Sequence, residues 1–110
     1  MVRISLQLIA RRGDAKHLAT ALRALVVQAQ GEQGCIGCRL FSDVTNANAL
    51  CYIEEWLTES ALRGQIRSER FHRLIAIMEA AAERPRFEVQ VVTVSHGLEY
   101  LEAMLRTNDS

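Results

Sequence analysis

Glu54 and Trp56 are the residues of this chain best suited to chemistry, because they stand two positions apart in a largely apolar segment. Residues two apart on a strand share a face, so the carboxylate and the indole should lie side by side. A carboxylate beside an aromatic ring on a half-buried face is either a hydrogen-bonded structural group or a general base. Trp56 is likewise either a core aromatic or a wall for a flat ligand, and composition alone favours the structural role for both.

A run of arginines follows this pair at intervals of four, three and three: Arg63, Arg67, Arg70 and Arg73. On one continuous helix they would form a guanidinium stripe able to bind a carboxylate or a phosphate. Ser68 is expected to begin a new helix inside this run, which breaks the register. The pattern therefore favours a solvated face.

Histidine supplies the other candidate for acid–base work. His72 stands in the expected helix after Ser68, while the other two histidines fall in different elements at no metal-ligand spacing. We therefore predict no metal site. No phosphate-binding loop, dinucleotide fingerprint or Ser-His-Asp pattern is present, which weakens hydrolase, nucleotide-dependent and dehydrogenase interpretations.

Length and charge narrow the possible partners. The chain has 110 residues, with 13 basic and 13 acidic side chains and a formal net charge of zero, so no overall field attracts nucleic acid or an anionic membrane. The first residues alternate like a strand, and no apolar run is long enough to span a membrane, so we expect a cytoplasmic protein. Three cysteines are an odd number and favour reduced thiols; Cys35 and Cys38 should point to opposite faces of one strand.

Hydrophobic periodicity then defines the elements. Strands are predicted over residues 2–10, 35–42, 50–56 and 87–94, with residues 43–47 as the loop of a hairpin. One helix should run from a cap at Asp14 to a stop at Gly31, and a short one from Thr58 to Arg67. A longer helix capped by Ser68 should end at Pro85, with its apolar face made by Phe71, Leu74, Ile75, Met78 and Ala82.

The predicted order is β-α-β-β-α-β, which defines an α+β, ferredoxin-like fold with an antiparallel sheet and helices on one face. Residues 1–94 should form this domain and residues 95–110 a helical extension that packs across a dimer or over a cleft. The third strand is apolar on both sides, yet helices cover only one. We therefore expect a homodimer packed sheet to sheet.

The chain also resembles the antibiotic biosynthesis monooxygenase family. The resemblance rests on Glu54-x-Trp56, then Ala61-Leu62, then Ser68-x-x-Phe71, after a strand that opens at Gly34-Cys35, and it extends over residues 2–94. It implies a dimeric α/β barrel of two ferredoxin-like protomers. In quinone-forming members it implies oxidation of a small aromatic substrate by molecular oxygen, without flavin, metal or haem, between sheet and helices.

The same resemblance implies roles for particular positions. Trp56 would line the cleft, while Tyr52 and Leu62 stand where quinone-forming members have an asparagine and a tyrosine. Gln65 stands where many members have a histidine, and Arg70 where a second one is often found. The remaining candidates are Tyr52 as a hydrogen-bond donor, Glu54 or His72 as a base, and Gln7 or Gln65 as a polar positioner.

Two alternatives remain open at this stage. Haem-degrading relatives hold haem with a tryptophan, a first-strand asparagine and a helical histidine, for which Gln7 or Ser5 and His72 would have to substitute. The other alternative is a dimeric module that binds a small hydrophobic metabolite without turning it over. The missing asparagine and histidine favour that module nearly as much as catalysis.

Overall fold

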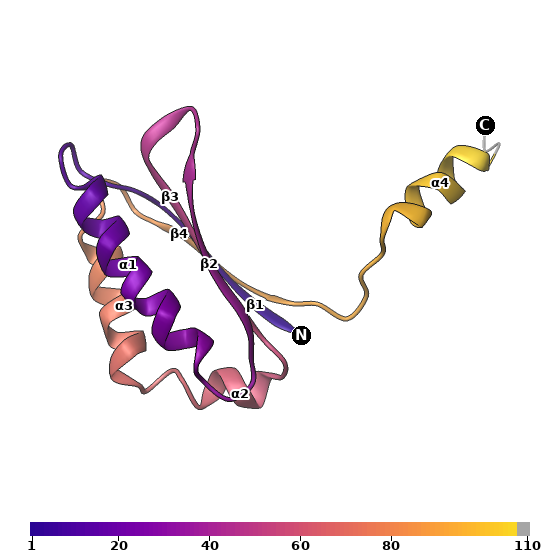
Figure 1. The fold of residues 1–110 in the computed structure, drawn as a ribbon, viewed down its shortest axis with the longest axis horizontal. Coiled ribbons are helices and arrows are strands. Elements are labelled where there is room, and N and C mark those ends of the chain that lie inside the picture. Colours follow the sequence, from indigo (N-terminus) through magenta and orange to yellow (C-terminus); the bar gives the residue numbers. More distant parts are fainter. Residues whose placement is uncertain (108–110) are drawn as a thin grey trace.

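A four-stranded antiparallel sheet with helices on one face forms the body of the molecule (Figure 1). The computed structural model describes residues 1–107, so the last three positions of the expected extension over residues 95–110 lie outside the described part. In chain order the elements are β1 (Val2–Ile9), α1 (Ala15–Gln30), β2 (Cys35–Asp43), β3 (Asn46–Trp56), α2 (Glu59–Arg63), α3 (Glu69–Glu79), β4 (Arg86–Val91) and α4 (Leu98–Arg106). The predicted ferredoxin-like α+β fold is confirmed.

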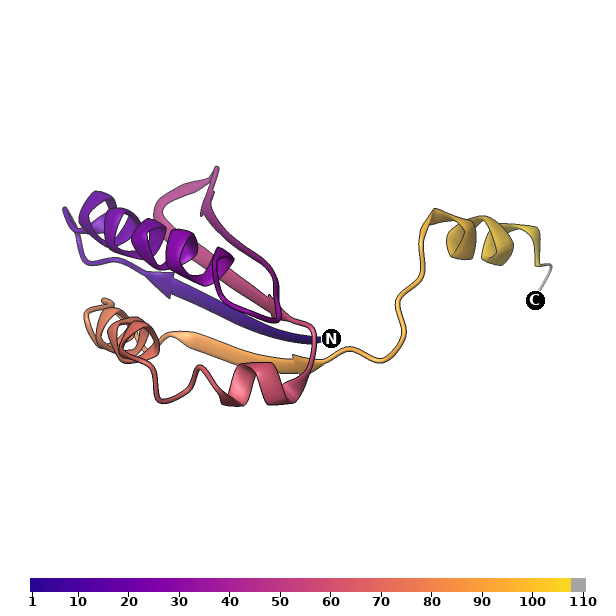
Figure 2. The same cartoon turned by 60° about the horizontal axis from the view of Figure 1, so that its bottom comes forward.

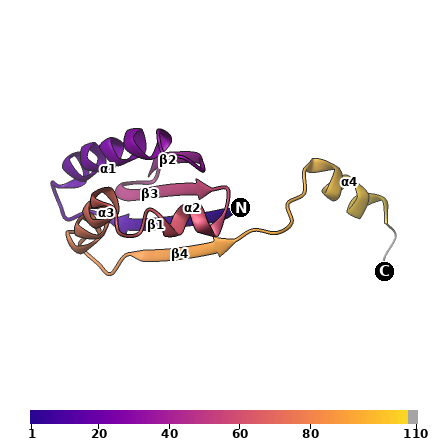
Figure 3. The ribbon, with the colours of Figure 1, turned by 90° about the horizontal axis from the view of Figure 1, so that it is seen from below.

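The strand order is β2-β3-β1-β4, with β1 paired to both β3 and β4. The first three helices lie on one side of this sheet, and Figures 2 and 3 show the layer that they form. β4 is an edge strand of the sheet, next to β1. The other face of the sheet carries no helix of the described chain.

Alternation along β1 builds the core. Val2, Ile4, Leu6 and Leu8 point toward the helices and are almost completely buried, as their spacing predicts. Most of the buried apolar side chains form one cluster between the sheet and α1 and α3. A second, smaller cluster around Trp56, Ile4 and Leu62 lies at the end of the sheet nearest α2. The two clusters share Cys35, Phe71 and Phe87 as neighbours.

Several boundaries differ from the prediction. The β2–β3 hairpin is longer than expected, because strand pairing continues to Asp43 and Asn46 across the expected loop. α2 ends at Arg63, with Gly64 as its C-cap, and not at Arg67. α3 ends at Glu79, six residues before Pro85, because the chain then forms an isolated bridge between Ala81 and Ala10.

The prediction for Cys35 and Cys38 is corrected. A register shift between Cys35 and Gly37 inserts one extra residue, so Cys35 lies opposite Trp56 and Cys38 opposite Glu54. Both cysteines therefore face the helical layer. They are free thiols in the described structure, and Cys38 is buried.

The C-terminal helix α4 lies apart from the rest of the molecule. Figures 1 and 2 show it at the end of an extended segment that leaves β4 beyond the sheet, and all nine of its residues are exposed. Within residues 1–107, no helix is both long enough and apolar enough to cross a membrane.

Candidate functional site

Three hydrogen-bond donors converge on the carboxylate of Glu54 between the sheet and the helices. The Tyr52 hydroxyl donates to Oε2 at 2.5 Å, the Trp56 indole Nε1 donates to Oε1 at 2.9 Å, and Arg70 Nη1 donates to Oε2 at 2.6 Å. Tyr52, Glu54 and Trp56 alternate along β3, so they lie on one face of this strand, as the sequence predicts. Tyr52, Glu54 and Trp56 are 0% exposed and Arg70 is 5% exposed, so this Glu54 cluster is shielded from water.

The arginine comes from the helical layer. Ser68 begins α3 by accepting a hydrogen bond from the Phe71 backbone, as predicted, and Arg70 lies in the first turn. Arg70 points toward the sheet because it shares a helix face with Leu74, four residues later, which is completely buried. The expectation of a solvated arginine face is therefore wrong for this residue, whereas Arg73 is exposed and paired with Glu69.

The apolar face of α3 is also rotated from the prediction. Leu74 is buried and Phe71 and Met78 pack against the core, as predicted. Ile75 is 41% exposed and Ala82 is exposed, whereas Ala81 is buried and Ile77 packs against the core. Arg70 stands four residues before the buried Leu74, and this spacing is the sequence feature that could have identified the inward arginine. A charged residue at that position is easily assigned to solvent, because buried arginines are rare.

Electrostatics follow from this enclosure. Burial, reinforced by the neighbouring Glu54 carboxylate, raises the pKa of the Tyr52 phenol well above its ordinary range. Burial alone would lower the pKa of the Arg70 guanidinium, but the hydrogen bond and charge of Glu54 outweigh it and the pKa rises. Arg70 therefore keeps its positive charge, and Tyr52 keeps the proton that it donates.

A polar chain connects the Glu54 cluster to the surface. Arg70 Nη2 donates to the Gln65 amide oxygen at 3.3 Å, and Gln65 Nε2 donates to the Glu32 carboxylate at 3.2 Å. Glu32 and Gln65 line an open hollow of about 570 Å³ together with residues of α2. Gln65 therefore lies between solvent and Arg70, which binds the buried Glu54 carboxylate.

The wall of this hollow is tightly packed at Gly34. Its backbone has a φ of 86°, and a Cβ built there would lie 2.6 Å from Cβ of Ala61 on α2. Gly34 O also accepts a hydrogen bond from the Leu57 amide at 2.8 Å. A glycine is therefore required for α2 to lie this close to the start of β2.

Of the other predicted site residues, one lies near the Glu54 cluster and two lie away from it. Leu62 of α2 is buried in the small cluster with Trp56, so it belongs to the same region. His72 is exposed on α3, outside the Glu54 cluster. Gln7 lies on the opposite face of the sheet, since its neighbours Leu6 and Leu8 face the helices. The structure therefore does not bring together the first-strand and helical residues that the haem alternative requires.

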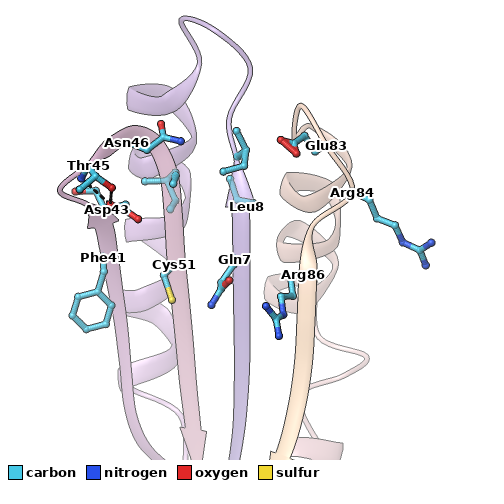
Figure 4. Close-up of a pocket in the computed structure, with 14 residues that line it drawn as sticks. Gln7, Leu8, Phe41, Asp43, Thr45, Asn46, Cys51, Glu83, Arg84 and Arg86 are labelled. Atoms are coloured by element: carbon cyan, nitrogen blue, oxygen red, sulfur yellow. Dashed lines mark hydrogen bonds between the residues drawn. The ribbon is translucent and has the colours of Figure 1, made fainter.

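Gln7 instead lines a hollow of about 610 Å³ on the open face of the sheet. Figure 4 shows Phe41, Cys51, Gln7 and Arg86 side by side on the neighbouring strands β2, β3, β1 and β4, while Arg84 points outward. Phe41 is 48% exposed on this face.

The fold and the buried cluster define the class of protein: it is a ferredoxin-like α+β protein in which a carboxylate and a tryptophan are enclosed between the sheet and the helices. Residues 1–77 match the antibiotic biosynthesis monooxygenase family, which is more than half of the chain. The chain belongs to the antibiotic biosynthesis monooxygenase family. No curated protein matches it.

Solved structures agree on the fold. One described as an antibiotic biosynthesis monooxygenase is 22% identical with a TM-score of 0.74, covering 86% of this chain and all of its own. A protein from Pseudomonas aeruginosa is 26% identical with a TM-score of 0.72, covering 84% and 94%. A protein from Deinococcus radiodurans, described as a putative antibiotic biosynthesis monooxygenase, is 16% identical with a TM-score of 0.78, covering 88% and 97%.

Proposed function

We propose that the protein is a cofactor-independent monooxygenase that oxidises a small aromatic or quinol-like substrate in the layer between sheet and helices. The observation that carries this proposal is the convergence of Tyr52, Trp56 and Arg70 on Glu54. Such a reaction needs a base to remove a substrate proton and fixed donors to hold the resulting anion away from water. The cluster contains both kinds of group beside an indole surface.

The chemistry assigns one task to each side chain. Glu54 removes a proton from an activated CH₂ of the substrate, and Tyr52 and Arg70 donate hydrogen bonds to the oxygen on which the charge collects. Trp56 and Leu62 hold the flat ring system. The anion then reacts with molecular oxygen, so that one oxygen atom becomes a new carbonyl and the other leaves as water with the two substrate hydrogens.

Access requires the cluster to open. Arg70 Nη1 donates a hydrogen bond to the Glu54 carboxylate at 2.6 Å, which blocks this carboxylate from a substrate. Arg70 Nη2 donates to the amide oxygen of Gln65. The segment between α2 and α3, which contains Gln65, closes the cluster on the side of the 570 Å³ hollow. We propose that displacement of this segment admits the substrate, since loop closure over a reacting centre is a common way to exclude water.

The same geometry favours a second function, a metabolite-binding module without turnover. The specific observation is that Tyr52, Glu54 and Trp56 are fully buried and satisfy one another, as expected of a structural network. A ligand would then bind in a surface hollow, without displacing Arg70.

The experiment is oxygen uptake with a panel of anthrones and hydroquinones. Glu54→Gln and Tyr52→Phe should each lower kcat at least about 100-fold, as expected for loss of a base or of an anion donor. Glu55→Gln is the matched control, because Glu55 is adjacent in sequence but lies on the opposite face of the sheet, and it should retain activity.

Circular dichroism of each variant separates loss of activity from loss of fold. Uptake that survives in folded Glu54→Gln would overturn the assigned site. Thermal stabilisation by a panel compound with no oxygen uptake and no product by mass spectrometry would favour the binding module.

The open face of the sheet supports a further part of the same proposal, a homodimer packed sheet to sheet. Phe41 is nearly half exposed there, and Cys51 and Ile53 are only partly buried. Glu55 lies on this face with Arg3 and Arg39, which provides charged groups that could fix the register of two copies.

A further inference from the structure

The guanidinium of Arg70 has two edges that can donate hydrogen bonds, and only one of them is well paired. Nη1 donates to the Glu54 carboxylate at 2.6 Å and to the Tyr52 hydroxyl at 3.3 Å. Nη2 donates to the Gln65 amide oxygen at 3.3 Å, while Nε is buried and has no acceptor within residues 1–107. A buried N–H without a partner is rare in folded proteins, so an acceptor from a ligand is expected beside Nε.

Nε and Nη2 belong to the same edge of the guanidinium. The hydrogen on Nε and one hydrogen on Nη2 point in parallel directions within the plane of the group, and this fork matches the two oxygens of a carboxylate. Gln65 offers the fork a single oxygen at 3.3 Å, which is longer than the about 2.7–2.9 Å typical of a guanidinium–carboxylate bond. The Nε–Nη2 edge is therefore only half paired, and through a long contact.

The Gln65 amide lies where one oxygen of a carboxylate would bind. Its Nε2 donates to Glu32 at 3.2 Å, which turns the amide oxygen toward Arg70. The Gln65 side chain is only partly buried and lines the hollow of about 570 Å³. Rotation of this side chain into the hollow would uncover the Nε–Nη2 edge without any movement of α3.

The charges around this edge favour an anion with a single charge. Arg70 is the only basic side chain that is buried within residues 1–107, and Glu54 already binds its other edge. Glu32 adds a second carboxylate at the rim of the hollow. A doubly charged phosphate would share one cation with two carboxylates, whereas a ligand carboxylate adds only one negative charge and has the planar shape of the fork.

We propose that the Nε–Nη2 edge of Arg70 binds a carboxylate group of the substrate, which takes the place of the Gln65 amide oxygen. The Arg70 guanidinium carbon is 5.8 Å from the centroid of the Trp56 ring, so a ring that carries this carboxylate lies within reach of the indole. The substrate class is then an aromatic carboxylic acid. In naming a substrate the inference rests on the proposed function, but binding of the carboxylate requires no turnover.

Isothermal titration calorimetry with 2-naphthoate and the neutral, similarly shaped 2-naphthamide tests this site. The wild-type chain should bind 2-naphthoate at least about tenfold more tightly, because only the carboxylate pairs with both Nε and Nη2. Equal dissociation constants, or no detectable binding of 2-naphthoate, would overturn the proposal. Tighter binding of 2-naphthyl phosphate than of 2-naphthoate would also overturn it.

Two variants with the same change in charge locate the site. Gln65→Glu places a carboxylate of the chain itself against Arg70, so the preference for 2-naphthoate over 2-naphthamide should fall below about threefold. Gln33→Glu is the matched control, because Gln33 lines the same hollow but makes no hydrogen bond to Arg70 in the described structure. Its preference should stay within about twofold of wild type, and equal losses in the two variants would contradict the assignment.

Oxygen uptake separates this inference from the proposed function. A clear preference for 2-naphthoate, with no uptake from any anthrone or hydroquinone, would leave the carboxylate site in place and reject the oxygenase. Uptake at equal kcat/KM from neutral and carboxylated anthrones would support the oxygenase and reject the carboxylate site. The combination expected here is uptake with kcat/KM at least about tenfold higher for the carboxylated compound.

Discussion

Glu54 and Glu55 are consecutive residues of one strand, and each is paired with arginine, yet they lie in opposite environments. Glu54 points toward the helices and is completely buried with Arg70. Glu55 points to the open face, where Arg3 and Arg39 contact it from β1 and β2 at 2.9 and 3.3 Å. Glutamate and arginine therefore form a buried ion pair on the helix-covered face of the sheet and a partly solvated ion triad on its open face.

The difference shows that the number of ion pairs does not predict how much each one affects the free energy of unfolding when it is mutated. Water and dissolved ions screen the triad on the open face, and Arg39 is more than half exposed. Beneath the helices, removal of one partner would leave a charge with no solvent to replace it. The buried pair should therefore dominate the effect of mutation even if its net contribution to folding is small.

The largest effect is expected for Arg70→Met, which keeps the length of the side chain but removes its charge. The variant leaves Glu54 buried beside only two neutral donors, so the free energy of unfolding should fall by about 3–5 kcal/mol. Urea denaturation followed by circular dichroism measures this change. A loss below about 1 kcal/mol would mean that Glu54 is not enclosed as described.

An intermediate effect should appear in the pH dependence of stability. Burial raises the pKa of the Cys38 thiol from its ordinary value of 9.0 to about 11. Between these values the unfolded chain loses a proton that the folded chain keeps, so stability is full below pH 9 and falls as the pH rises to about 11. The loss should reach about 2–3 kcal/mol over that window.

Cys38→Ala should therefore reduce the decline in unfolding free energy above pH 9 without abolishing it, because the Tyr52 phenol, whose pKa is also raised from 10.0, adds its own loss of stability above pH 10. Cys51→Ala, from the opposite face of the same sheet, is the comparison: Cys51 is only partly buried and burial raises the pKa of its thiol as well, so its removal should reduce the decline less than Cys38→Ala does. Identical slopes for wild type and Cys38→Ala would show that the thiol ionises as readily in the folded protein as in the unfolded one.

The smallest effect is expected for Arg39→Met on the open face. In the separate protomer Glu55 keeps Arg3 and water screens the lost contact, so at protein concentrations where the chain is monomeric the free energy of unfolding should change by less than about 1 kcal/mol. The difference from wild type should shrink further when salt is added during the urea titration. A larger loss that appears only at concentrations where the chain is dimeric would support the proposed sheet-to-sheet dimer, whereas a loss comparable with that of Arg70→Met in the separate protomer would show that the contact is not screened by water.

Much of the fold follows from short-range patterns. Alternation in β1 and helical spacing in α1 identify their elements because each has one face packed against the core. The caps at Thr58 and Ser68 are also confirmed. The ends of the elements were less predictable: pairing carries the β2–β3 hairpin across its expected loop, and an extra residue after Cys35 reverses the parity of β2.

The site was only half predictable for a related reason. Parity along β3 places Tyr52, Glu54 and Trp56 on one face, which depends on local geometry alone. The partner Arg70 comes from α3, and whether it turns inward depends on how that helix packs against the sheet. An arginine is usually solvated, so only its spacing from Leu74 distinguishes it from Arg67 and Arg73.

Arg70 also provides a way to time the opening of this layer. Its Nε atom is buried and has no acceptor within the described residues. The hydrogen on Nε can exchange with solvent only when water enters between the sheet and α3. The exchange rate of this single proton would therefore report how often the Glu54 cluster opens, in the absence of any substrate.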